Sequence, residues 1–156
     1  MATRSTISIV ESKAKDAPGR QIYCHWDGYC SNNGILLLEH YNTPERVNAL
    51  IGLGAISSLT PNIAPQEEGV LKKWNSDKGE YDSIVTKEPH TFDNPHHGVV
   101  VAYHRDRGEE LAINYFNGKP YSRNDEEYNY LFVESENQWY VRTGKNFIKL
   151  TEKMCS

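Results

Sequence analysis

The stretch QIYCHWDGY at residues 21–29 alternates in a way that predicts a β-strand with two different faces. One face is apolar and carries Ile22, Cys24 and Trp26. The other is aromatic and ionisable and carries Tyr23, His25, Asp27 and Tyr29. Successive strand side chains point to opposite faces, so we expect the apolar set in a core and the other set in a row. That row is either a ligand-binding surface or the ordinary second face of an antiparallel sheet.

The segments near this stretch predict an α+β fold, a mainly antiparallel β-sheet with a short helical pair packed on one face. Alternation over residues 3–11 predicts a first strand, which a turn joins to residues 21–29 as an antiparallel hairpin. Residues 35–41 predict a short helix. A second helix is expected to begin at Thr43-Pro44, because Thr caps helices and Pro is favoured at the first helical position.

The second half of the chain supplies the remaining strands. Residues 98–104 contain three valines in a row, and a continuous apolar run predicts a central strand covered on both faces. Residues 127–133 and 138–143 predict a hairpin. Its alternating aromatic residues indicate either core packing or an exposed patch for a protein partner. These residues are Tyr128, Tyr130, Phe132 and Trp139.

Length and composition predict one domain over residues 1–156. A chain of 156 residues that is 38% hydrophobic is long and apolar enough for a core of its own. Within it, residues 61–97 predict an irregular excursion, because prolines, glycines and charges interrupt any period. The part at residues 61–88 is the best candidate for a mobile flap.

Charge and cysteine content narrow the partners and the location. A net charge of −4 with mixed signs argues against duplex nucleic acid as a partner, although a few arginines can still hold a short anion. No apolar run approaches the length of a membrane span, so we expect no membrane contact. Three cysteines without a dense framework predict reduced thiols and a cytosolic setting.

Four stretches taken together resemble a family of small phage and prophage proteins. They are CHWDGY within residues 21–29, a helical segment ending in ISSL at residues 56–59, AYHRDRGE at residues 102–109 and EEYNYLFVESENQWYV at residues 126–141. The chain differs from that pattern in having Cys30 where the family has Pro, and in a longer segment at residues 61–88. The resemblance implies a phage context, in which small accessory proteins often act by binding to host machinery, and it implies no particular activity.

Two constellations are candidates for a ligand site. His25 and Asp27 share a predicted strand face with two tyrosines that are suited to stacking on a base. The alternative is a cross-strand polar network. In HRDRG at residues 104–108, Arg105 and Arg107 flank Asp106 in a pattern that can clamp a phosphate. The alternative is a solvated turn whose charges balance one another.

Catalytic and metal motifs are weak in this sequence. No HExxH, CxxC or GxSxG pattern is present, so we expect no metal and no cofactor. An enzyme stays open as the alternative, a small phosphodiesterase or nucleotide-cleaving enzyme. Its catalytic residues would be His25, Asp27, His104 and Asp106, if the two predicted strands are neighbours.

The sequence therefore favours a phage-encoded accessory protein that counteracts a bacterial defence system by binding, in the host bacterial cytoplasm. In one version it sequesters a small anionic, nucleotide-like ligand, and in the other it inhibits a host defence protein. Homo-oligomers are compatible with either version. We expect the two constellations to border one concave site, with residues 61–88 or 90–97 passing over it. The predicted ligand-binding residues are Tyr23, His25, Trp26, Asp27, Tyr29, His104, Arg105 and Arg107.

Overall fold

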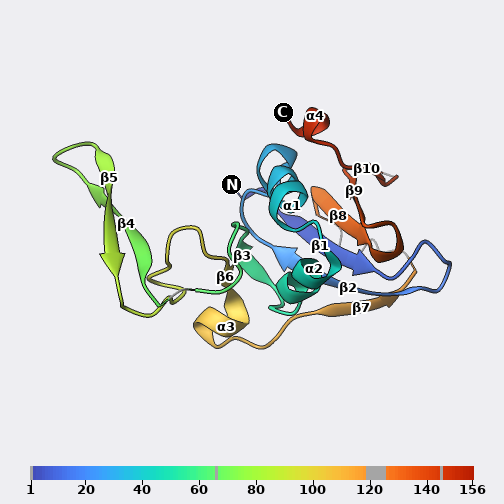
Figure 1. Ribbon diagram of the computed structural model, residues 1–156, viewed down its shortest axis with the longest axis horizontal. Coiled ribbons are helices and arrows are strands. Elements are labelled where there is room, and N and C mark those ends of the chain that lie inside the picture. Colours follow the sequence, from blue (N-terminus) through green and yellow to red (C-terminus); the bar gives the residue numbers. More distant parts are fainter. Residues whose placement is uncertain (1, 66, 119–125, 145) are drawn as a thin grey trace.

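The computed structural model describes residues 2–65, 67–118, 126–144 and 146–156. These residues form an α+β fold with a large, mostly antiparallel sheet, a separate two-stranded sheet and short helices (Figure 1). The predicted fold class is confirmed. Among the described residues, no helix is both long enough and apolar enough to cross a membrane.

The large sheet has the strand order β10-β9-β8-β1-β2-β3-β6, and β7 pairs with the first part of β2. Strand β1 runs parallel to β8, strand β2 runs parallel to β3, and the other neighbours are antiparallel. The strands are β1 (Ser5–Val10), β2 (Pro18–Cys24), β3 (Ile56–Ser58), β6 (Val101–Ala102), β7 (Asn114–Asn117), β8 (Tyr128–Val133), β9 (Gln138–Arg142) and β10 (Ile148–Lys149).

Strand β1 lies in the middle of this sheet, and all six of its residues are buried. Ile7 and Ile9 belong to the main core beneath the helices, as their alternation predicts. The polar residues of the other face are also buried, because they bond across strands. Thr6 donates to Asn129 at 2.7 Å, and the hydroxyl of Ser8 accepts from Gln21 at 3.1 Å. The β1–β2 hairpin predicted from the sequence is confirmed.

Helices α1 (Ile35–His40) and α2 (Pro44–Ile51) cover one face of the sheet, as predicted (Figure 1). Helix α2 begins as its sequence indicates, because the Thr43 hydroxyl accepts from the amide of Arg46 and Pro44 fills the first turn. Its buried residues are Val47, Leu50 and Ile51. The aromatic row of β8 and β9 joins the same core, so the packing interpretation of that row is the correct one.

Two predicted strands end earlier than expected. Strand β2 stops at Cys24, and the backbone of Asp27 turns into the left-handed region at a φ of 53°. The parity argument therefore fails beyond Cys24, and Trp26 is exposed instead of buried. Of residues 98–104 only Val101–Ala102 is a strand, and it lies at the end of the sheet instead of its centre. The chain then enters helix α3 (Tyr103–Arg107).

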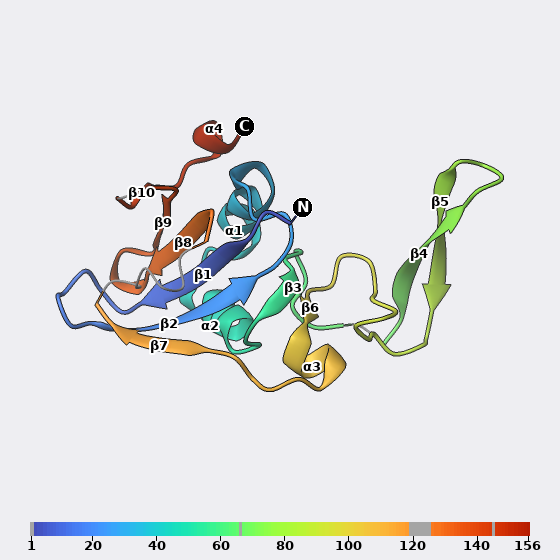
Figure 2. The same cartoon turned by 180° about the vertical axis from the view of Figure 1, so that it is seen from behind.

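Within the excursion at residues 61–97 lies a regular hairpin that the sequence interpretation did not identify. Strands β4 (Gly69–Asn75) and β5 (Glu80–Thr86) pair in one unbroken antiparallel register. This hairpin, here called the arm, projects away from the rest of the molecule (Figures 1 and 2). At its tip, the Asn75 side chain accepts from the amides of Asp77 and Lys78, and Gly79 takes a left-handed φ of 66°.

The C-terminus is tied to the helical side of the fold by a disulfide between Cys30 and Cys155. Cys30 begins the π-helical turn η1 (Cys30–Gly34), and Cys155 ends helix α4 (Glu152–Cys155). The expectation of reduced thiols is therefore wrong for these two residues. They are 125 positions apart, so their spacing gave no indication of pairing. Cys24 is free and buried, and burial raises the pKa of its thiol to about 11.

Candidate functional site

The first predicted constellation forms a compact aromatic cluster at the end of β2. Tyr23 Oη and His25 Nδ1 share a hydrogen bond of 2.7 Å, and the His25 ring meets Trp26 edge-on at 4.7 Å. Trp26 is 45% exposed and Tyr29 39% exposed, so this cluster lies at the surface. It does not form the regular row expected from a strand, because the strand has already ended.

Strand β3 lies between the two predicted constellations in the sheet. The amides of His25 and Trp26 donate to the carbonyls of Ile56 and Ser57, so the first constellation continues toward the C-terminal end of β3. The amide of Tyr103 donates to the carbonyl of Ala55, so helix α3 begins beyond the N-terminal end of the same strand. The two stretches therefore leave β3 in opposite directions. Whether they border one concave site stays a prediction.

Arg105 points its guanidinium group into the protein. Its Nε donates to the Asp106 carboxylate at 2.7 Å, and its two terminal nitrogens donate to the carbonyls of Ile63 and Val100 at 2.5 Å. Ile63 lies where the chain enters the excursion, and Val100 lies where the chain returns from it. Arg105 therefore fastens the two ends of the excursion to each other, through the planar fork that suits an arginine to several acceptors at once.

Asp106 receives hydrogen bonds from three sides. Its carboxylate accepts from Arg105, from the amide of Ala102 at 2.8 Å and from His90 Nε2 at 3.0 Å. Burial opposes ionisation of this carboxyl group, but the hydrogen bonds outweigh burial and hold its pKa below the usual range. The side chains of His90 and Asp106 are almost fully buried, so the pair is an internal support and is not open to a substrate.

Two histidines complete this network. The amide of His96 donates to His90 Nδ1 at 2.9 Å, which assigns the His90 proton to Nε2, facing Asp106. His96 Nε2 lies 2.8 Å from the carbonyl of Glu88. The His96 ring rests on Gly69, where a Cβ atom would come within 2.1 Å of His96 Nδ1. The first residue of the arm therefore has to be glycine.

We call this network the root of the arm. It comprises Ile63, His90, His96, Val100, Arg105 and Asp106. The amide of His97 adds a hydrogen bond of 2.6 Å to the carbonyl of Val70, inside the arm itself. Sequence reasoning treated the histidines as separate from the HRDRG stretch. The structure joins them, and it makes the arginine–aspartate pair a clamp on the chain.

The rest of helix α3 is engaged at the surface. Arg107 pairs with Glu109 and lies over the rings of Phe92 and Tyr103, at 4.1 and 5.2 Å from their centroids. His104 Nδ1 lies 2.7 Å from the carbonyl of Glu109. Gly108 ends the helix with a left-handed φ of 74°. The role of these residues in binding a ligand stays a prediction, as does the alternative catalytic set, since no ligand is present.

In the described part of the chain, no group of three or more histidine, cysteine, aspartate or glutamate side chains is arranged to hold a metal ion. Of the histidines, His90 and His96 lie near each other, with ring centroids 5.5 Å apart. Their nitrogens face Asp106, a backbone amide and a backbone carbonyl.

The arm carries aromatic residues that sequence reasoning did not place in a site. Trp74 and Tyr81 are directly opposite each other on β4 and β5, and their rings meet at 5.1 Å. Trp74 is 58% exposed and Tyr81 is 63% exposed. On the same face, Val70 faces Val85, which is 64% exposed. The signal in the sequence is the turn-forming stretch from Asn75 to Gly79 between two runs that contain β-forming residues, VL and W before it and Y and IV after it.

Comparison of the chain with protein-family models, with curated proteins and with solved structures found no match in any of the three.

Proposed function

We propose that this protein acts by binding, and that the exposed face of the arm docks on a partner protein. The observation that carries the proposal is the Trp74–Tyr81 pair, which a projecting hairpin holds in solvent. Tryptophan and tyrosine are the residue types that most often supply the binding energy of protein interfaces. A surface that exposes them together with valine is costly unless a partner covers it.

The arm is also held at its base, where Gly69 packs against His96 and the His97 amide donates to the carbonyl of Val70. A two-stranded hairpin alone is marginally stable in water, so an isolated arm needs support. The root supplies that support through Arg105, Asp106 and the two buried histidines. An arm held at its base loses less conformational entropy on docking than a flexible one, and this favours tight binding.

The charges of the arm favour a protein partner over nucleic acid. Residues 69–86 contain three lysines and three acidic residues, so the arm has no net charge. Lys78 pairs with Asp82, and Lys72 donates to the hydroxyl of Ser83. Binding to a phosphate backbone needs a net positive surface. An uncharged arm with an aromatic face is instead complementary to an apolar hollow on a protein.

The biological setting in this proposal comes from the resemblance to phage proteins. We propose a phage-encoded inhibitor whose partner is a component of a bacterial defence system. The nucleotide-sequestering version has less geometric support at the residues first singled out, because Arg105 is occupied by Asp106 and two carbonyls. The phosphodiesterase version is also less favoured, since Asp106 is bound to His90 and Arg105, away from His25.

We place the encounter in the host cytoplasm. A reducing cytoplasm rarely maintains disulfides, so the Cys30–Cys155 bond of the structure is the observation that counts against this location. Alkylation of intact cells before lysis, followed by mass spectrometry, measures whether the Cys30–Cys155 bond is closed in the host. A Cys30–Cys155 bond that is already closed at the moment of alkylation would overturn the cytoplasmic location.

The main experiment compares two tryptophans. Tagged wild-type protein, the arm variant Trp74→Ala/Tyr81→Ala and the control Trp26→Ala are each used to capture partners from lysate of a defence-carrying bacterium. We expect one protein to bind the wild type and the control but not the arm variant, and purified components to reproduce this by calorimetry. Equal binding by all three proteins would contradict docking through the arm. Calorimetry with cyclic nucleotides tests the nucleotide version, and turnover with and without divalent metal tests the enzyme.

A further inference from the structure

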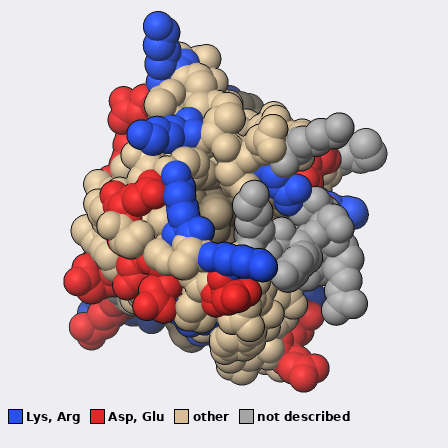
Figure 3. All heavy atoms as spheres, turned by 90° about the vertical axis from the view of Figure 1, so that its right-hand side faces the viewer, with Lys and Arg blue, Asp and Glu red and all other residues tan. Residues whose placement is uncertain are grey.

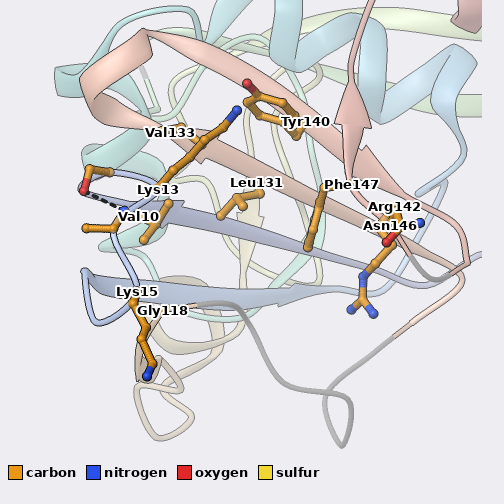
Figure 4. A pocket seen from close by; sticks show the side chains of 12 residues that line it. Val10, Lys13, Lys15, Gly118, Leu131, Val133, Tyr140, Arg142, Asn146 and Phe147 are labelled. Carbon is orange, nitrogen blue, oxygen red and sulfur yellow. Dashed lines mark hydrogen bonds between the residues drawn. The ribbon is translucent and has the colours of Figure 1, made fainter.

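A cavity of about 560 Å³ lies at the end of the molecule opposite the arm (Figure 4). It is formed by strands β8 and β9, the end of β1, the loop at residues 12–15, Gly118 and the segment at residues 146–147. Its size falls within the range of small-molecule sites, which run from roughly 300 to 1,000 Å³. Nothing in the proposed arm contact uses this cavity.

The floor of the cavity is apolar and well packed. Val10, Leu131 and Val133 come from three neighbouring positions on β1 and β8, and they belong with Tyr140 to a second, smaller core. Phe147 packs against the same core and stands in the cavity wall (Figure 4). An aromatic ring above a floor of aliphatic side chains is suited to a flat apolar group.

The rim of the cavity is cationic. Lys13 and Lys15 stand on the side of the β1–β2 loop, and Arg142 stands across the cavity beside Phe147 (Figure 4). The guanidinium carbon of Arg142 lies 5.1 Å from the Phe147 ring centroid. Figure 3 faces this end of the molecule and shows Lys and Arg side chains over its middle, with Asp and Glu side chains mostly nearer the margins.

This local charge differs from that of the whole chain. The chain has a net charge of −4, yet the twelve lining residues that belong to the described part of the chain include three cations and no acid. One acidic group lies close by, since Glu136 pairs with Lys13 at 3.3 Å and accepts from the Tyr140 hydroxyl. Lys15 is exposed, so it is the cation that an anionic group entering the cavity meets.

We propose that this cavity binds a small organic anion with a flat apolar body. The body lies on Leu131 and beside Phe147, and the anionic group faces Lys15 and Lys13 at the loop. Both parts of the ligand are required. An inorganic anion has no apolar surface to bury on the floor of the cavity, and a neutral ring has no charge to interact with the lysines. Nucleoside monophosphates and aromatic acids share this chemistry.

The test uses pairs of probes that share an aromatic body, where one member carries an anionic group and the other is neutral. Naphthalene-1-sulfonate is compared with 1-naphthalenemethanol, AMP with adenosine, and inorganic phosphate serves as the anion without a body. We expect at least one charged aromatic probe to bind by calorimetry, and its neutral relative and phosphate to bind about tenfold more weakly or less. The comparison of the sulfonate with AMP distinguishes a site for aromatic acids from a site for nucleoside monophosphates.

Matched variants locate the site. Lys15→Glu and Ala14→Glu place negative charge on the rim. Lys87→Glu is the matched control for Lys15→Glu, because it makes the same change of charge near the arm. Rim variants should weaken binding about tenfold, while Lys87→Glu leaves it unchanged. Amide chemical shifts measured during titration should move at residues 10–15, 131–133 and 140–147. The proposal is overturned if no probe binds below millimolar concentration, if neutral probes bind equally well, or if both kinds of variant have the same effect.

Discussion

Two hairpins of this protein contain nearly the same aromatic pair in opposite surroundings. In the β8–β9 hairpin Phe132 faces Trp139, and in the arm Trp74 faces Tyr81. The ring centroids are 5.1 Å apart in both pairs. The first pair is at most 2% exposed, whereas the second pair is 58% and 63% exposed. Local pairing is therefore the same, and what differs is whether another layer covers it.

The difference separates structural aromatic residues from available ones. Helices α1 and α2 cover the β8–β9 hairpin, and the Trp139 indole donates to the carbonyl of Tyr41 at 2.7 Å, beside helix α1. Nothing in the described chain covers the Trp74–Tyr81 face in the same way. Burial of a large aromatic side chain contributes to stability in proportion to the area removed from water. The exposed aromatic pair of the arm does not supply this stabilisation within the described chain. Burial of the pair against a partner would supply it on binding.

The largest effect on the free energy of unfolding is expected when the buried aromatic pair is truncated. Trp139→Ala should lower the free energy of unfolding by about 3–5 kcal/mol, because it leaves a cavity and removes a partner from the Tyr41 carbonyl. Urea denaturation followed by circular dichroism measures this loss. A loss below about 1 kcal/mol would mean that the β8–β9 pair is less important to the core than its burial indicates.

A second prediction concerns the root. Asp106→Ala removes the acceptor shared by Arg105, His90 and the Ala102 amide, and breaking a buried pair of this kind costs about 3 kcal/mol. We expect the effect to appear in the arm first. Hydrogen exchange should speed up at residues 69–86 more than at residues 128–142. Glu109→Ala breaks an exposed pair with Arg107 and should change exchange little, so equal effects of the two variants would contradict the role of the root.

The same carboxyl group gives the root a pH dependence. The folded-state pKa of Asp106 lies below the unfolded value, so ionisation stabilises the fold above the unfolded pKa. This stabilisation is lost as the pH falls from about 4 through the folded pKa. We expect the protection factors of the arm amides, which compare exchange with the intrinsic rate at each pH, to fall over that range. The change should be smaller than in Asp106→Ala, because a protonated carboxyl group still accepts hydrogen bonds. An Asp106→Asn protein with the same acid response as the wild type would contradict this assignment.

The smallest expected effect on stability is that of the exposed pair. Trp74→Ala should change the free energy of unfolding by no more than about 0.5 kcal/mol, because the indole is already mostly in water. Its large effect is expected on partner binding instead. Denaturation and calorimetry on the same preparation separate the two. A destabilisation comparable to that of Trp139→Ala would show that the arm aromatic residues serve the fold after all.

Local signals were sufficient where the element forms from neighbouring residues. Thr43-Pro44 predicted the start of α2, and alternation over residues 3–11 predicted β1 and its hairpin partner. The same alternation misled at residues 25–29, because the backbone of Asp27 leaves the strand conformation at the turn-forming pair Asp27-Gly28, which an argument from alternation alone does not weigh. Val99 and Val100 are apolar because the segment that precedes β6 is buried, which periodicity does not distinguish from a strand.

The candidate site was harder to predict because its contacts are distant in sequence. HRDRG was a candidate ligand site, but Arg105 and Asp106 within it bond to Ile63 and His90, which are 42 and 16 positions away. A sequence alone does not show whether an arginine faces solvent or two backbone carbonyls. The arm was missed for another reason. Its two strands mix apolar and polar residues on both faces, so periodicity did not indicate the pairing that places Trp74 opposite Tyr81.

The Cys30–Cys155 bond changes what a cut in the arm does to the protein. The bonded residues enclose a loop of 125 positions that contains the whole arm. When this bond is closed, a protease that cleaves the arm opens a ring and releases no fragment. The nicked protein then keeps its mass and its body sheet, and its two pieces separate on a gel only after reduction. An arm that is cut in this way loses its docking surface while the rest of the molecule stays in one covalent piece.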